Sequence, residues 1–204
     1  MKNLRFILLA GAILCAACAP VELDIVTVDA PAINCLFDSD CSIVVNDMAS
    51  ELELVGMTGT GFLQSRTAPP GEAGTVAAGL YDYEYRIDLR QMSGILNIAC
   101  VDTLTVEFGP VSELDYDGSG DADASYVITR GGLGNIAPSV AEQVGNVLKF
   151  GFSPGVCPGG APGNGDSSYF FGLASAHPPH TVDATIRDSE GQEYSLEVQA
   201  PDFP

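Results

Sequence analysis

The chain has 204 residues, of which 27 are acidic and only 8 are lysine or arginine, so its formal net charge is −19 at pH 7. A surface of this charge repels nucleic acid and anionic lipid headgroups, and it lacks the basic patch that either partner would need. The length suits a single domain of ordinary size.

The first residues predict export. Lys2 and Arg5 precede an apolar run of about nine residues, from Phe6 to Leu14, and small residues follow it. This pattern is typical of an export signal, and the run is too short for a membrane-spanning helix. No later segment of the sequence is long and apolar enough to span a bilayer.

The end of this signal resembles the bacterial lipobox, in which small residues precede a cysteine that is acylated and becomes the mature N-terminus. Ala16, Ala17 and Cys18 match that motif, whereas Cys15 stands where a leucine-like residue is usual. The resemblance implies a signal over residues 1–17, lipidation at Cys18 and contact with a membrane only through that lipid. Cleavage after Ala17 without acylation is the alternative, and it would release a secreted protein.

The cysteine count supports export. If Cys15 leaves with the signal and Cys18 carries lipid, an even set of four remains, which suits disulfides in an oxidising compartment. Three pairings are open, and we favour a short local loop, Cys35–Cys41, together with a long-range link, Cys100–Cys157. The spacing of these cysteines does not fit a zinc site, because the body contains no CxxC.

The sequence pattern predicts that the body of the chain consists mainly of β-strands. We expect a tether over residues 18–32 and one domain over residues 33–204. Strands are expected in the segments 41–47, 51–57, 81–90, 94–100, 103–109, 125–130, 147–152, 168–175, 181–188 and 194–200. The segment 137–145, "APSVAEQVG", is the one expected helix. The fold class is therefore all-β, an antiparallel β-sandwich of about ten strands, jelly-roll or immunoglobulin-like, stapled by disulfides.

Two of these strands carry clear facing patterns. The segment "YDYEYRIDLR" at 81–90 alternates aromatic or aliphatic residues with charged ones, which predicts a half-buried strand whose charged face lies in water. The run Tyr169, Phe170 and Phe171 predicts a strand that is buried on both faces, with an exposed patch for a partner as the alternative.

The segment "DYDGSGDAD" at 115–123 is the strongest candidate site. Calcium takes six to eight oxygen ligands from carboxylates at alternating positions of a tightly turned chain. Asp115, Asp117, Ser119, Asp121 and Asp123 fit the first nine positions of such a loop, but a twelfth-position glutamate and flanking helices are missing. The segment resembles the looser DxDxDG calcium loops of exported proteins, with Glu113 as a further candidate ligand. An acidic turn without metal is the alternative.

Other catalytic or metal-binding patterns are weaker. His177 and His180, the only histidines, are separated by two prolines and are a poor pair of zinc ligands, even with Asp183 close by. Ser167 and Ser168 follow Asp166, but no GxSxG motif surrounds them. The chain also has no tryptophan, which weakens the case for a glycan-cleaving cleft.

These patterns together predict an exported, lipid-anchored protein of the bacterial cell envelope, at the outer membrane or cell surface, or else secreted. Its expected role is binding or structural, with an unidentified protein or glycan as partner and calcium as a structural ion. The alternative is an extracellular hydrolase that uses acidic residues or the His177/His180 loop.

Overall fold

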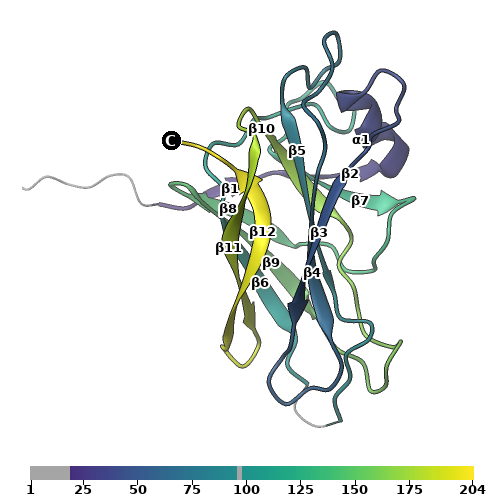
Figure 1. Ribbon diagram of the computed structural model, residues 1–204, viewed down its shortest axis with the longest axis vertical. Coiled ribbons are helices and arrows are strands. Elements are labelled where there is room, and N and C mark those ends of the chain that lie inside the picture. The colour runs from purple at the N-terminus through teal and green to yellow at the C-terminus, as the bar shows by residue number, and fades with distance from the viewer. Residues whose placement is uncertain (1–18, 96–97) are drawn as a thin grey trace, which may run out of the picture.

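A computed structural model describes residues 19–95 and 98–204, and these form a two-layered β-sandwich with one helix (Figure 1). Cys18 and the signal expected over residues 1–17 lie outside the described residues. The elements are β1 (Val21–Leu23), β2 (Ile25–Asp29), α1 (Ala30–Phe37), β3 (Asn46–Leu52), β4 (Gly61–Thr67), β5 (Tyr81–Asp88), β6 (Val101–Glu107), β7 (Ser125–Arg130), β8 (Val140–Val144), β9 (Val147–Val156), β10 (Phe171–Ser175), β11 (Pro179–Asp188) and β12 (Glu193–Pro201).

The strands form two six-stranded sheets. The first has the order β1-β8-β9-β6-β11-β12, and the second has the order β2-β7-β10-β5-β4-β3. Neighbouring strands are antiparallel in every pair except β2 with β7, which run parallel. The expected antiparallel β-sandwich is thereby confirmed, with more strands than the expected ten and one parallel pair at the edge of the second sheet.

The main core lies between the two sheets. Tyr83, Tyr85 and Ile87 of β5 point into it and are fully buried. Phe171 of β10 meets Phe150 of β9 across the core, with the ring centroids 4.6 Å apart. The period-two alternation of β5 therefore identified its inward face correctly.

The other face of β5 is not in water, and this corrects the sequence-based expectation. Asp82, Glu84 and Arg86 are each at most 5% exposed. A second apolar cluster covers the outside of this sheet and includes Ile33 and Phe37 of α1. The alternation of β5 gave the direction of each side chain correctly, but it could not indicate that another layer lies over the polar face.

The aromatic run at 169–171 is buried on both faces as expected, but only Phe171 belongs to strand β10, and Tyr169 and Phe170 precede it. Phe171 belongs to the main core, whereas Phe170 belongs to the outer cluster, together with Tyr126 of β7. Tyr169 is partly buried against the main core.

Several expected element boundaries differ from the structure. Of the tether expected over 18–32, the described residues from Val21 onward form β1, β2 and the start of α1. Pro31 lies in the first turn of α1, where its missing N–H leaves no hydrogen bond unmade. The helix expected over 137–145 is strand β8, because pairing with both β1 and β9 outweighs its helix-forming alanine, glutamate and glutamine. The segments 41–45, 53–57 and 98–100, which were expected to be strands, are loops, and β4 was not expected.

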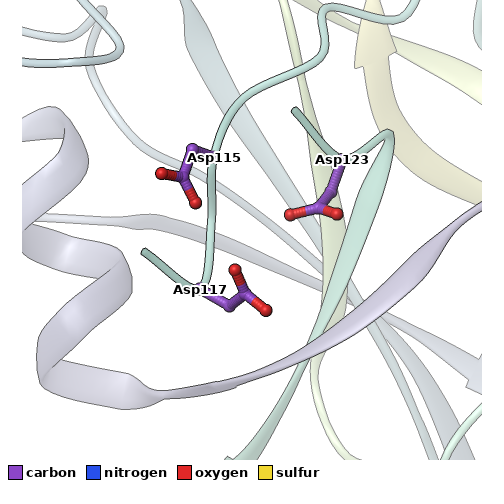
Figure 2. Close-up of side chains that lie close together, drawn as sticks. All are labelled: Asp115, Asp117 and Asp123. Carbon is purple, nitrogen blue, oxygen red and sulfur yellow. The ribbon is translucent and has the colours of Figure 1, made fainter. Parts of the chain in front are cut away.

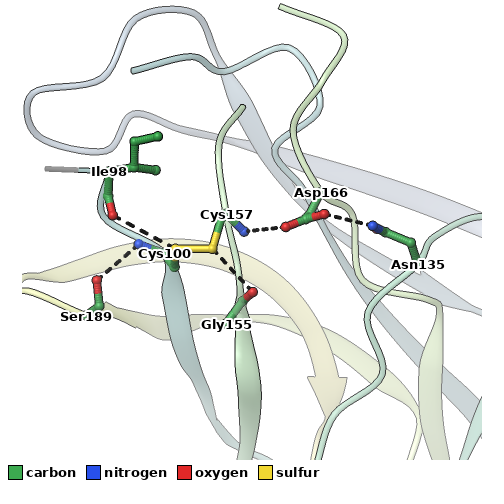
Figure 3. The surroundings of a disulfide bond; sticks show 7 residues. All are labelled: Ile98, Cys100, Asn135, Gly155, Cys157, Asp166 and Ser189. Atoms are coloured by element: carbon green, nitrogen blue, oxygen red, sulfur yellow. Dashed lines mark hydrogen bonds between the residues drawn. A yellow bond between two sulfur atoms is a disulfide. The ribbon is translucent and has the colours of Figure 1, made fainter. Parts of the chain in front are cut away.

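The disulfides are Cys35–Cys41 and Cys100–Cys157, which is the pairing that the sequence favoured. Cys100 and Cys157 flank the paired residues Val101 of β6 and Val156 of β9, so this bond closes the end of a strand pair (Figure 3). Two disulfides indicate an oxidising, extracytoplasmic environment. Within the described residues, no helix is long and apolar enough to cross a membrane.

Candidate metal site

The acidic loop lies between β6 and β7 and is closed at its base. Leu114 and Asp123 form an antiparallel bridge, with N–H···O distances of 3.0 and 2.8 Å. Gly118 and Gly120 have positive φ values of 77° and 96°, which L side chains rarely adopt, so these glycines allow the chain to reverse between the aspartates. The closed base brings the two ends of the acidic segment together.

This closure gathers three carboxylates. One oxygen from each of Asp115, Asp117 and Asp123 lies within 4.8 Å of the others, and Figure 2 shows the three side chains turned toward a common space. Among the described residues, this is the one group of three or more acidic, histidine or cysteine side chains close enough to hold a metal ion. The loop can therefore hold a metal ion.

Two oxygens of the cluster are buried without a hydrogen bond. Neither Asp115 Oδ1 nor Asp123 Oδ2 has a partner among the residues that the structure describes, and Asp123 is only 7% exposed. Leaving a buried carboxylate oxygen unpaired is costly, because it loses water and gains nothing in exchange. A bound cation would supply the missing partner for both oxygens.

The other oxygens of the loop are held by the backbone. Asp117 Oδ1 accepts a hydrogen bond from the Ser119 N–H at 2.9 Å, and Asp115 Oδ2 accepts one from the Gly120 N–H at 3.0 Å. These bonds preset the turn, so little rearrangement is needed for the carboxylates to meet an ion.

The electrostatics of the cluster differ between its inner and outer sides. Burial raises the pKa of Asp123, and the nearby charge of Asp117 raises it further. On the exposed side, the hydrogen bond from the Ser119 backbone lowers the pKa of Asp117. A cation would relieve the repulsion at Asp123 and favour the ionised form of its carboxyl.

Not all of the residues predicted for this site join the cluster. Ser119 uses its hydroxyl to accept a hydrogen bond from the Asp121 N–H at 3.3 Å. The exposed carboxylate of Asp121 lies outside the group of three. Glu113, the further candidate, is exposed and lines a different pocket, together with Ala124.

The histidine and serine candidates are not brought together as a catalytic group. In the described part of the chain, neither imidazole forms a hydrogen bond. The backbone of His177 does so, since its N–H donates to the Ser175 hydroxyl at 3.4 Å and its carbonyl oxygen accepts from the Tyr83 hydroxyl at 2.7 Å. Ser167 and Ser168 are at most 1% exposed, and their hydroxyls accept bonds from Arg86 Nε and the Ile87 N–H. These serines support β5 and are not accessible to a substrate.

A buried acid pair, which the sequence did not indicate, lies beneath the acidic loop. The Tyr126 hydroxyl is 2.6 Å from Asp82 Oδ1 and 3.2 Å from Glu84 Oε1. Tyr116, between two aspartates of the loop, packs against Tyr126 with the rings tilted by 48° and their centroids 4.8 Å apart, and its hydroxyl accepts a hydrogen bond from the Ala174 N–H. The loop is thus fixed to the sheet through Tyr116.

Comparison with known proteins does not assign the chain to a family: no family model, curated protein or solved structure matches it.

Proposed function

We propose that this protein is an exported, lipid-anchored β-sandwich of the bacterial cell envelope with a binding or structural role, and that its acidic loop holds a structural calcium ion. The observation that carries the calcium proposal is the pair of buried, unpartnered oxygens of Asp115 and Asp123. Every candidate ligand is an oxygen, which favours calcium or magnesium over zinc. The irregular loop suits calcium, because magnesium requires near-ideal octahedral geometry.

The ion would have a structural consequence. It would neutralise the repulsion among Asp115, Asp117 and Asp123, and so hold the loop that places Tyr116 against the outer cluster. Without the ion, that repulsion would favour opening of the loop and loss of the Tyr116 contacts. This is why stability is the expected readout of calcium binding.

We expect calcium to raise the melting temperature by about 5–10 °C over a chelator-treated sample. At a calcium concentration of roughly 100 times Kd, binding stabilises the folded state by about 2.7 kcal/mol. For a chain of this size, each kcal/mol raises the melting temperature by about 2–4 °C. Asp123→Asn should abolish the calcium response, and it should raise the calcium-free melting temperature, because it removes a buried charge. Thermal melting with calcium, magnesium or EDTA measures both effects.

The matched control is Asp121→Asn, which removes an exposed charge from the same loop and should retain most of the calcium response. A melting temperature that is the same in calcium and in EDTA would contradict the calcium proposal. A response equally large in Asp123→Asn would place the ion elsewhere.

The anchor is proposed from the lipobox resemblance at Cys18. Val21, the first residue of β1, is only three residues away, a span of at most about 10 Å. A lipid on Cys18 would therefore hold the sandwich directly at the membrane surface, since the following residues belong to β1 and β2.

For the anchor, we expect mass spectrometry of the mature protein from bacterial membranes to find an N-terminal, acylated Cys18. Cys18→Ala should move the protein from the membrane to the soluble fraction. An unmodified Cys18, or a variant that fractionates unchanged, would contradict lipid anchoring.

A further inference from the structure

A pocket of about 250 Å³ adjoins the proposed calcium ion. It lies between β2, α1 and β7, and it shares Tyr116 and Asp117 with the acidic loop. Figure 2 shows the same arrangement, with the loop beside α1 and the strand that leads into it. The volume is about that of one small organic molecule.

Asp117, on the exposed side of the acidic cluster, also lines this pocket. Asp123 is buried and Asp117 is exposed, so the cluster has an inner and an outer side. Calcium takes six to eight oxygens, and three carboxylates cannot supply that number unless every one is bidentate. With Asp123 buried, the remaining coordination positions of a bound ion would lie on the exposed Asp117 side, within reach of a molecule in the pocket.

The other lining groups are hydrogen-bonding side chains. Thr27 of β2 and Thr129 of β7, which carry hydroxyls, line the pocket. Asp29 and Arg130 are partners in the parallel pairing of these strands, and Arg130 Nε lies 3.8 Å from Asp29 Oδ1. Their side chains are 50% and 82% exposed. The pair is loose and accessible, so both its acceptor and its donor atoms are available to a ligand.

The charge around the pocket disfavours an anionic ligand. The carboxylates of Asp29, Asp115, Asp117 and Asp123 outweigh one guanidinium and a doubly charged ion, so the site stays negative with calcium bound. The whole chain carries a formal charge of −19, which repels anions further. A neutral molecule rich in hydroxyls matches both the ion and the mixed donors and acceptors of the wall.

We propose that this pocket binds a neutral saccharide, with two adjacent hydroxyls of one sugar completing the coordination of calcium beside Asp117. Arg130 and Asp29 hold further hydroxyls of the sugar, and Thr27 and Thr129 border it. The proposal rests on the calcium site and gives a chemical class to its ligand.

The test uses the full mature protein and three neutral probes, the methyl glycosides of mannose, galactose and fucose. Isothermal titration or saturation-transfer NMR in calcium should detect binding of at least one glycoside, and EDTA should abolish it. Arg130→Ala should weaken that binding about tenfold, the loss of one hydrogen bond to a charged group. The same variant should leave the calcium-induced shift in melting temperature unchanged.

Arg187→Ala is the matched control, because it removes an exposed arginine from β11 in the other sheet and should bind the glycoside as the parent does. Calcium binding without binding of any of the three glycosides overturns the saccharide proposal and leaves the calcium site standing. The absence of any calcium-induced shift overturns both. Glycoside binding that is unchanged in EDTA or in Arg130→Ala overturns the assignment to this pocket. Preferential binding of acetate, an anionic probe, overturns the assignment of a neutral ligand.

Discussion

Removing the Cys100–Cys157 disulfide by the double substitution Cys100→Ala and Cys157→Ala is expected to lower the free energy of unfolding by about 4 kcal/mol. The two cysteines are separated by 57 residues, so the bond restricts a long loop of the unfolded chain. In the chain-entropy model, this restriction is the main source of the stabilisation. For a chain of this size, the loss corresponds to a fall of roughly 8–16 °C in melting temperature.

The native surroundings of this bond explain why the variant should still fold. Val101 and Val156, next to the two cysteines, remain paired between β6 and β9. The Cys157 N–H also donates to Asp166, whose other carboxylate oxygen accepts a hydrogen bond from Asn135 at 2.7 Å (Figure 3). These contacts keep the following loop in place in the folded state. Removing the disulfide therefore acts mainly by increasing the conformational entropy of the unfolded chain.

The other disulfide provides the control. Cys35 and Cys41 are only six residues apart, so the same model predicts a loss of about 2 kcal/mol for the double alanine variant. Equilibrium denaturation in urea, fitted for both double variants and the parent, measures the difference. Equal losses, or a larger loss for the short loop, would contradict the assignment of the stabilisation to loop length.

The parts of the fold that the sequence predicted are those governed by local pattern. The alternation in β5 gave the correct direction of each side chain, because side chains of a strand alternate whatever lies above them. Phe170 and Phe171 also lie on opposite sides of the sheet as expected, although only Phe171 is within a strand. Segment 125–130 matches β7 for the same reason. Helix α1 went unpredicted although Ile33 and Phe37 have the spacing of one helical face, because the segment is short and apolar overall.

Only the local part of the candidate site could likewise be predicted from the sequence. The three clustered aspartates lie within nine residues, so their spacing alone indicated a metal loop. The burial of Asp123 depends on the bridge to Leu114 and on the layer that surrounds it, so it could not be predicted from the local sequence pattern. Asp29 lies beside Arg130 and the loop only because β2 pairs with β7, a contact between segments about 100 residues apart.

The buried acid pair makes the stability of this protein depend on pH in a specific direction. Burial and the charge of Glu84 raise the pKa of Asp82, and burial raises the pKa of Glu84 to about 7. Between pH 4.5 and about 7, the folded state therefore holds more protons than the unfolded state, so the pair reduces the free energy of unfolding as pH rises. Above that window, the full cost of the Glu84 charge is present.

Glu84→Gln should remove the part of this dependence that Glu84 causes. The glutamine side chain has nearly the same shape and can still contact the Tyr126 hydroxyl, but it carries no charge. We expect the variant to match the parent near pH 4 and to be more stable by about 1–3 kcal/mol at pH 8. Urea denaturation at pH 4, 5, 6, 7 and 8 measures the difference, with the same excess of calcium in every sample so that the acidic loop contributes equally to both proteins.

The result also shows which neighbour determines how the charge of Glu84 affects stability. Arg66 of β4 places a guanidinium nitrogen 3.6 Å from Glu84 Oε2, but its Nε lies 2.7 Å from Asp47, so its charge is shared. Because the Tyr126 hydroxyl has one proton for two carboxyls, it cannot satisfy both when both are ionised. If Arg66 were nevertheless the dominant partner, Glu84→Gln would become less stable than the parent as pH rises. Glu51→Gln, which alters an exposed carboxyl on β3, should show no such trend in either case.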